Sequence, residues 1–138
     1  MSNVQQLPIG VFDSGVGGLS VLKVLQEQFP NEDFIYIGDN ANNPVGNRSD
    51  DEITYLACHI AEALEKQPVK LMVIACNTFT VVALDAVRER VSVPVIGVSQ
   101  GVKTAISQSK SKTIGIMATV ATVNSHIHKH CLLYTSDA

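Results

Sequence analysis

The chain has 138 residues and a formal net charge of -3, which is long enough for one ordinary domain with a buried core. The chain is mildly acidic and has no long run of like charge, so it lacks the excess of basic residues that typically binds a nucleic acid. We therefore expect no nucleic-acid partner. No basic region precedes an apolar run at the N-terminus, and no later run is long enough to cross a bilayer, so we expect a cytoplasmic protein without membrane association.

The first third of the chain predicts two strands joined by a helix. Residues 8–13 form an apolar strand, a turn rich in glycine follows at residues 15–18, and a second strand covers residues 33–38. The intervening helix is expected to bury Leu19, Leu22, Val24 and Leu25. A polar loop at residues 39–47 then separates the second strand from the next helix.

The next helix has the clearest signals in the sequence. Ser49 and Glu52 have the spacing of a capping box, which predicts the start of the helix. Apolar residues then follow the helical period at Ile53, Leu56, Ala57, Ile60 and Leu64. Cys58 lies beside this apolar face, and we interpret it as a packing residue.

Strands and helices continue to alternate after residue 70. Residues 71–75 form a strand, and a helix follows with an apolar pattern from Thr80 to Val87. Further strands are expected at residues 94–98 and 113–117, with short helices at residues 102–106 and after Thr122. This order predicts an α/β fold with a doubly wound parallel sheet and right-handed crossovers.

The chain is expected to divide into three parts. Residues 1–99 form a first α/β domain, and residues 100–130 begin a second, similar domain that is left incomplete. Residues 131–138 do not continue the preceding pattern, and we expect them to be a non-native tail. We therefore expect that the whole chain is a truncated protein.

Cys76 follows a strand that is apolar throughout, which is typical of a sheet buried on both faces. Ligands of such sheets bind beyond the carboxyl ends of the strands. Asn77 and Thr78 are suited to begin a helix, and a thiol at a helix N-terminus is favoured as thiolate. The alternative interpretation is that Cys76 is a small buried hydrophobe before a turn.

The loops after successive strands are expected to meet at one edge of the sheet. Backbone N–H groups of the glycine turn, together with Ser14, Asn77 and Thr78, could hold a small carboxylate while Cys76 reaches an adjacent carbon. Asp13 is expected to relay a proton with Cys76, since an acid there is unfavourable unless function requires it, or else only to bond the glycine turn.

Four segments together resemble the N-terminal half of the glutamate racemase family. They are residues 10–21 (GVFDSGVGGLSV), Gly38-Asp39 with Pro44-Val45-Gly46, Ala75-Cys76-Asn77-Thr78, and residues 94–98 (PVIGV). The resemblance implies two similar α/β domains and a racemase that needs no cofactor. It also implies that one cysteine lies on each face of the substrate α-carbon and that the product serves cell-wall peptidoglycan synthesis.

By the same resemblance, Cys76 is the first catalytic cysteine, with Asp13 beside it. Glutamate, the small-molecule substrate, is expected to contact Asp13 and Ser14, Val45 and Gly46, and Asn77 and Thr78. Taken alone, Gly46 can simply end a turn and Thr78 can simply cap a helix. A homo-oligomer is compatible with the full-length protein.

The sequence departs from the family pattern at two places. The family carries its second cysteine in a Cys-Thr-His motif, which these 138 residues lack, so we expect the chain by itself to be inactive. Neither Cys58 nor Cys131 replaces it, because the first belongs to a helix and the second to the expected tail. Val45 stands where the family usually has tyrosine, which makes glutamate specificity less secure.

Other functions stay open at this point. A related aspartate racemase, maleate isomerase or one-cysteine decarboxylase of the same fold would share these motifs. The glycine turn with Asp39 also resembles a dinucleotide-binding fingerprint, although Ser20 replaces the third glycine. We interpret His126, His128 and His130 as a solvated helix and not as a metal site, because no further ligand has suitable spacing.

Overall fold

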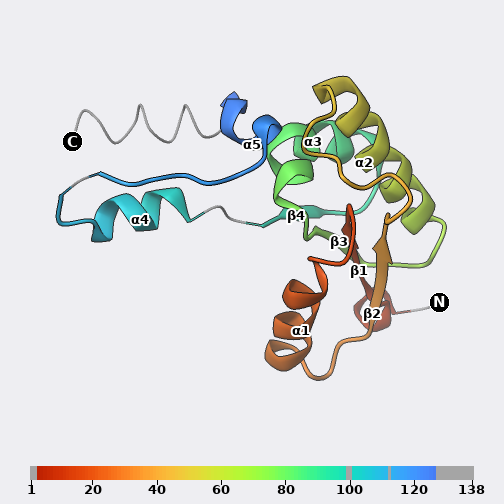
Figure 1. Cartoon of the computed structure of the whole chain (residues 1–138). Helices are drawn as coiled ribbons and strands as arrows, with labels where there is room; N and C mark the ends of the chain where they lie inside the picture. Colours follow the sequence, from red (N-terminus) through yellow and green to blue (C-terminus); the bar gives the residue numbers. More distant parts are fainter. Residues whose placement is uncertain (1–2, 99–100, 112, 127–138) are drawn as a thin grey trace.

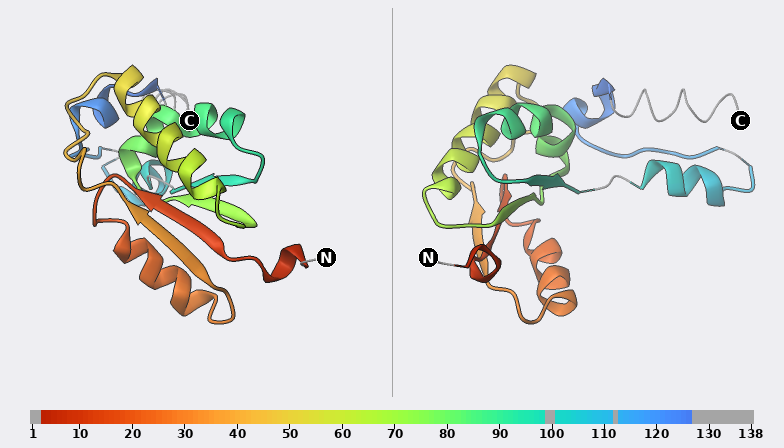
Figure 2. Two further views of the ribbon diagram at one scale, coloured as in Figure 1. Left: turned by 90° about the vertical axis from the view of Figure 1, so that its right-hand side faces the viewer. Right: turned by 180° about the vertical axis from the view of Figure 1, so that it is seen from behind.

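The computed structural model describes residues 3–98, 101–111 and 113–126. Four parallel strands form one sheet in the order β2-β1-β3-β4, with helices on both faces (Figure 1; Figure 2). The strands are β1 (Ile9–Asp13), β2 (Phe34–Gly38), β3 (Leu71–Ile74) and β4 (Val95–Gly97). The helices are η1 (Val4–Gln6), α1 (Leu19–Gln28), α2 (Asp50–Glu65), α3 (Asn77–Arg90), α4 (Val102–Gln108) and α5 (Val120–Asn124). The predicted doubly wound α/β class is confirmed.

The sheet separates two hydrophobic cores. Val11 and Phe12 are both 0% exposed, and as neighbours on one strand they face opposite sides of the sheet. Phe12 joins the larger core, which α2 and α3 cover, whereas Val11 joins the smaller core beneath α1. β1 is therefore buried along its whole length, Asp13 included.

The packed face of α1 differs from the predicted one. Leu22 and Leu25 contact the smaller core as expected, and Val21 joins them. Leu19 and Val24 are instead 48% and 54% exposed. The physical reason is that a single layer of helix covers this face of the sheet, so only a narrow stripe of α1 reaches it.

The start of α2 confirms the predicted capping box. The Ser49 hydroxyl accepts the Glu52 N–H at 3.3 Å, and the Glu52 carboxylate accepts the Ser49 N–H at 3.1 Å. The helix then buries its apolar face against the sheet and α3. Cys58 lies in this packing at 6% exposure, as interpreted from the sequence, and burial raises the pKa of its thiol.

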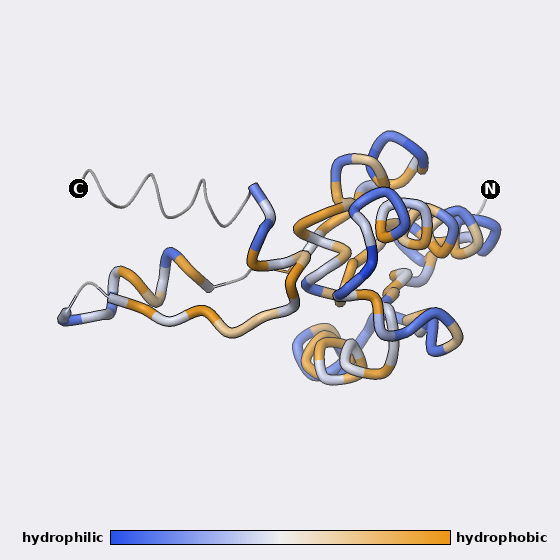
Figure 3. Tube along the Cα trace, turned by 45° about the horizontal axis from the view of Figure 1, so that its top comes forward, coloured by the Kyte–Doolittle hydropathy of each residue, from blue (hydrophilic) through white to orange (hydrophobic). Residues whose placement is uncertain are grey.

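We use the term body for the described residues up to 98, and arm for the described residues from 101 onward, which include α4, residues 113–118 and α5. The arm extends away from the sheet along α4 and returns through residues 113–118 to α5, which lies against α3 (Figure 1). Figure 3 shows hydrophobic residues along this returning segment, outside the body. No helix in the described ranges has both the length and the apolarity needed to span a bilayer.

Two predictions about the arm are wrong. Residues 113–117 were predicted as a fifth strand, but they have no strand assignment and pair with none of the described strands. An apolar run signals burial only if a sheet edge is beside it, and here the run lies beside α4 (Figure 1). The final helix begins at Val120, with Thr119 as its N-cap, and not after Thr122.

The division into a first domain (1–99), the start of a second (100–130) and a tail (131–138) stays a prediction. Its boundary falls at residues 99–100, which lie outside the described residues. The proposed tail, with Cys131, lies outside them too, as do His128 and His130. The predicted short helix near residues 102–106 is confirmed as α4.

Candidate active site

The first three strands bring their following loops to one edge of the sheet. Asp13 lies beside Gly38 in the parallel register, and Phe12 lies beside Ile74. The backbone continues this alignment one step further, because Ala75 donates its N–H to the Phe12 carbonyl at 2.8 Å. The predicted meeting of the three loops is therefore confirmed.

Cys76 is the N-cap residue of α3. Its sulfur accepts the Phe79 N–H at 3.4 Å, so the side chain satisfies a helix-end donor that serine or aspartate usually takes. The Thr80 hydroxyl donates to the Cys76 carbonyl at 2.9 Å and anchors the same turn. Asn77 and Thr78, which the sequence suggested as the helix start, are the first two residues of α3, and the N-cap is Cys76 itself.

Ser14 links the glycine turn to Cys76. Its hydroxyl oxygen lies 3.3 Å from the Cys76 sulfur, across 62 positions of sequence, and either group can be the donor. Cys76 is 7% exposed, so the thiol is shielded from most of the solvent. The two predicted site residues thus contact each other directly, and a thiolate here would receive both a hydroxyl and a backbone N–H.

The Asp13 carboxylate holds the glycine turn in place. Its Oδ2 atom accepts the Gly15 N–H at 3.2 Å and the Gly18 N–H at 2.9 Å, and the residue is 5% exposed. The carboxylate also lies at the N-terminus of α1, where the helix dipole favours a negative charge. The expectation that an acid is unfavourable here without a functional need is wrong, since the turn itself stabilises the carboxylate.

The position of Asp13 also changes the prediction of how a substrate carboxylate would be held. The N–H groups of the glycine turn were expected to hold a substrate carboxylate, but Asp13 already accepts two of them, those of Gly15 and Gly18. The same occupancy argues against a dinucleotide, whose pyrophosphate would need these donors. Among the side chains proposed to hold the carboxylate, the Thr78 hydroxyl is likewise engaged, by Thr119 and Thr122.

Tyr36 is a member of the site that sequence reasoning missed. It comes from β2, and its hydroxyl donates to the Gly15 carbonyl at 3.1 Å. Burial, followed by the charge of the Asp13 carboxylate, raises the pKa of Tyr36 to about 12. An aromatic residue in an apolar strand gave no signal beyond core packing.

Three threonines form a hydroxyl cluster beside the start of α3. The Thr78 oxygen lies 3.1 Å from that of Thr119 and 3.3 Å from that of Thr122, and Thr119 donates to Thr122 at 3.0 Å. Thr119 and Thr122 belong to the arm and were not predicted as site residues. The capping spacing from Thr119 to Thr122 is the signal that could have located this helix start.

The arm also covers the loop that carries Val45 and Gly46. Ala121 donates its N–H to the Gly46 carbonyl at 3.3 Å, and a Cβ atom at Gly46 would lie only 2.5 Å from the Thr119 methyl carbon. Val45 is 4% exposed and belongs to the larger core together with Ala121. Gly46 is thus needed for a close approach, and the Val45 side chain packs inward.

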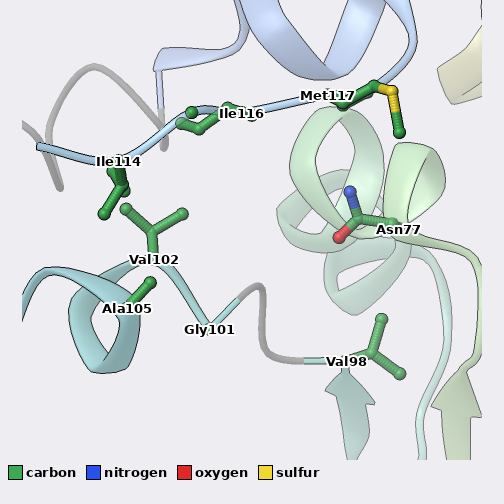
Figure 4. A pocket seen from close by; sticks show the side chains of 10 residues that line it. Asn77, Val98, Gly101, Val102, Ala105, Ile114, Ile116 and Met117 are labelled. Carbon is green, nitrogen blue, oxygen red and sulfur yellow. The ribbon is translucent and has the colours of Figure 1, made fainter. Parts of the chain in front are cut away.

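Asn77 faces a cavity of about 440 Å³ between the body and the arm (Figure 4). The figure shows its amide among apolar side chains that come from both the body and the arm. Those apolar residues include Val98, Val102, Ala105, Ile114, Ile116 and Met117. Of the predicted site residues, Asn77 is the one that lines this cavity. Across the described ranges, no three His, Cys, Asp or Glu side chains are placed to hold a metal ion.

The arrangement matches that of known racemases. Residues 9–133 match the family model for Asp/Glu/Hydantoin racemase. A glutamate racemase of Herpetosiphon aurantiacus is 50% identical over 116 residues, covering 84% of this chain and 46% of that protein. One of Picosynechococcus is 45% identical over 134 residues, covering 96% of this chain and 47% of that protein.

Solved structures of glutamate racemases are also similar to this chain. Glutamate racemase from Aquifex pyrophilus superposes with a TM-score of 0.85 at 41% identity, covering 93% of this chain and 51% of that one. The enzyme from Francisella tularensis, solved in complex with D-glutamate, gives 0.77 at 40% identity, covering 95% and 50%. The chain spans about half the length of the curated relatives it matches. It belongs to the Asp/Glu/Hydantoin racemase family.

Proposed function

We propose that this chain supplies the Cys76 half of a glutamate racemase active site, in which L-glutamate and D-glutamate are interconverted without a cofactor. The observation that carries the proposal is the Cys76 thiol, which caps α3 and lies 3.3 Å from the Ser14 hydroxyl. The similarity to glutamate racemases along nearly the whole chain supports the same reaction.

The chemistry needs one base and one acid on opposite faces of the α-carbon. The Cys76 thiolate takes the α-proton and becomes a thiol, while the electron pair of the broken C–H bond stays on the substrate. A second thiol, implied by the family's Cys-Thr-His motif, then donates a proton to the other face. Hydrogen bonds from Ser14 and the Phe79 N–H to the sulfur would favour the thiolate that begins this step.

Substrate contacts are proposed for Asp13, Ser14, Val45, Gly46, Asn77 and Thr78. Ser14, Asn77 and Thr78 present polar side chains near Cys76 and are suited to the amino and carboxylate groups of glutamate. The burial of Val45 favours a role in shaping the pocket wall through packing. Asp13 would act mainly by holding the turn that carries Ser14.

A fusion protein tests the proposal. Residues 1–126 of this chain would be joined to the remaining C-terminal half of the Herpetosiphon relative, and circular dichroism would follow L- and D-glutamate. We expect the fusion to racemise glutamate and the 138-residue chain alone to be inactive. Activity should persist with a chelator and with hydroxylamine, which traps pyridoxal-type cofactors.

Two variants decide the role of the thiol. Cys76→Ser in the fusion should lower turnover by several orders of magnitude, because a hydroxyl is a far weaker acid than a thiol. Cys58→Ser is the matched control, because it makes the same chemical change at a packing position, and it should keep its turnover. Wild-type turnover in the Cys76 variant would overturn the mechanism.

A second candidate is an aspartate racemase of the same family, because Val45 replaces the tyrosine usual among glutamate racemases. Comparing kcat/KM for aspartate and glutamate in the fusion separates the two. We further propose that the product supports peptidoglycan synthesis in the cytoplasm and that the complete enzyme forms a homo-oligomer. Size-exclusion chromatography with light scattering tests the last point.

A further inference from the structure

We propose that Tyr36 is a positioning residue, which sets the protonation state of Cys76 by holding Ser14 against the thiol. Tyr36 lies on β2, in a part of the chain that contributes none of the predicted substrate contacts. The inference concerns the thiol environment that the proposed racemase mechanism uses. Its test measures thiol chemistry and does not require racemase activity.

The first step of the argument is that both backbone groups of Gly15 are held. Its carbonyl accepts the Tyr36 hydroxyl at 3.1 Å, and its N–H donates to Asp13 at 3.2 Å. Ser14 lies between these two residues in the sequence, with Asp13 before it and Gly15 after it. Ser14 is therefore fixed from both sides. Tyr36 of β2 restrains the residue that follows it, and the Asp39 N–H restrains the residue that precedes it by donating to the Asp13 carbonyl at 3.0 Å.

The second step is that Tyr36 has little room to move. A Cβ atom at Gly18 would lie 3.0 Å from the Tyr36 hydroxyl oxygen and 2.7 Å from the Asp13 Cβ. The hydroxyl is thus packed beneath the glycine turn, next to the carboxylate. Its ring packs against the smaller core under α1, which makes the hydroxyl position a property of the sheet.

The third step connects the turn to the thiol. The Ser14 oxygen lies 3.3 Å from the Cys76 sulfur, and a hydroxyl held at this distance stabilises a thiolate more than a thiol. Without the Tyr36 hydroxyl, the Gly15 carbonyl loses its partner and the turn gains freedom, so Ser14 would spend less time at the sulfur. The titratable groups in this arrangement are Asp13 of β1, Tyr36 of β2 and Cys76 itself.

The experiment measures alkylation of Cys76 by iodoacetamide in the 138-residue chain. Peptide mass spectrometry separates Cys76 from Cys58 and Cys131, and rates are measured from pH 6 to the plateau at high pH. The rate at pH 7, divided by the plateau rate, reports the thiolate fraction and cancels changes in access. Far-UV circular dichroism checks that each variant is folded.

Four variants form a double-mutant cycle with a control. Ser14→Ala should lower the ratio about tenfold, the size expected for losing a hydrogen bond to a charged group. Tyr36→Phe should lower it about threefold, and the double variant should fall no further than Ser14→Ala alone. Tyr55→Phe makes the same change at a tyrosine that is 67% exposed on α2, and should leave the ratio unchanged.

Two results would overturn the inference. One is an unchanged ratio in a folded Tyr36→Phe variant. The other is a Tyr36→Phe effect of equal size with and without Ser14, since Tyr36 would then act on Cys76 by a route that bypasses Ser14. Neither result would contradict the proposed racemase function, because that function is tested separately by the turnover of the fusion protein and of its Cys76→Ser variant.

Discussion

The body and the arm bury their residues by different means. In the body, residues such as Val11, Phe12 and Leu64 are 0% exposed, because helices cover both faces of the sheet. In the arm, Met117 is 102% exposed and Val120 is 60% exposed, although the local sequence is just as apolar. The arm is held to the body largely at α5, by the threonine cluster and the Gly46 carbonyl.

This difference shows that hydrophobic sequence is not the same as hydrophobic burial. The body has apolar surfaces on successive elements that face each other, so their burial is mutual. The arm carries an apolar segment with no facing strand among the described residues, and it contacts the body through the threonine hydroxyl groups and through Ala121 of α5. Four predictions test whether the two regions really differ in this way.

The largest expected effect is in the core of the body. Leu64→Ala should lower the free energy of unfolding by about 2–5 kcal/mol, because the side chain is 0% exposed and leaves a cavity. Met117→Ala in the arm should change it by less than about 0.5 kcal/mol. Urea titration followed by circular dichroism measures both. Similar losses for the two variants would mean that the arm is packed as firmly as the body.

The next effect is overpacking at Val45. Val45→Tyr should cost about 1–3 kcal/mol, because the residue is 4% exposed and the larger ring must displace core neighbours. Val120→Tyr is the matched change in the arm, and at 60% exposure it should be nearly neutral. If Val45→Tyr keeps full stability, the loop must open toward the solvent and Val45 is not a core residue.

A smaller effect is expected at the joint between the regions. Thr122→Val keeps the shape of the side chain but removes the hydroxyl that contacts Thr78 and Thr119, at a cost of about 1 kcal/mol. Hydrogen exchange should accelerate in α5 and leave the β1 amides unchanged. Thr104→Val on exposed α4 is the control. Unaltered protection of α5 would show that apolar contacts, and not hydroxyl groups, hold the arm.

The last effect is a pH dependence within the body. Burial, together with the charge of the Asp13 carboxylate, raises the pKa of Tyr36 from 10.0 to about 12. Between pH 10 and about pH 12, Tyr36 keeps its proton in the folded state but loses it in the unfolded chain. The contribution of Tyr36 to the free energy of unfolding is therefore fully present below pH 10 and is lost as the pH rises toward 12. Urea titrations from pH 9 to 11.5 should show a shallower decline in Tyr36→Phe, whereas Tyr55→Phe should follow the wild type.

Local sequence signals predicted the body well because its elements obey short-range rules. The capping box at Ser49 needs only residues three apart, and the apolar run of β3 needs only its own composition. The same signals failed at residues 113–117, because a strand exists only when another strand accepts its hydrogen bonds. They also placed Leu19 and Val24 on the packed face of α1, where the sheet does not reach.

The sequence by itself determined the fold class and the candidate thiol, since alternating strand and helix patterns and the residues around Cys76 are legible along the chain. Tertiary structure alone decided the environment of that thiol. Ser14 reaches Cys76 across 62 positions, Tyr36 supports the turn from a neighbouring strand, and Thr119 meets Thr78 across 41 positions. Such contacts depend on the register of parallel strands and on where an arm returns, and neither is encoded in any local pattern.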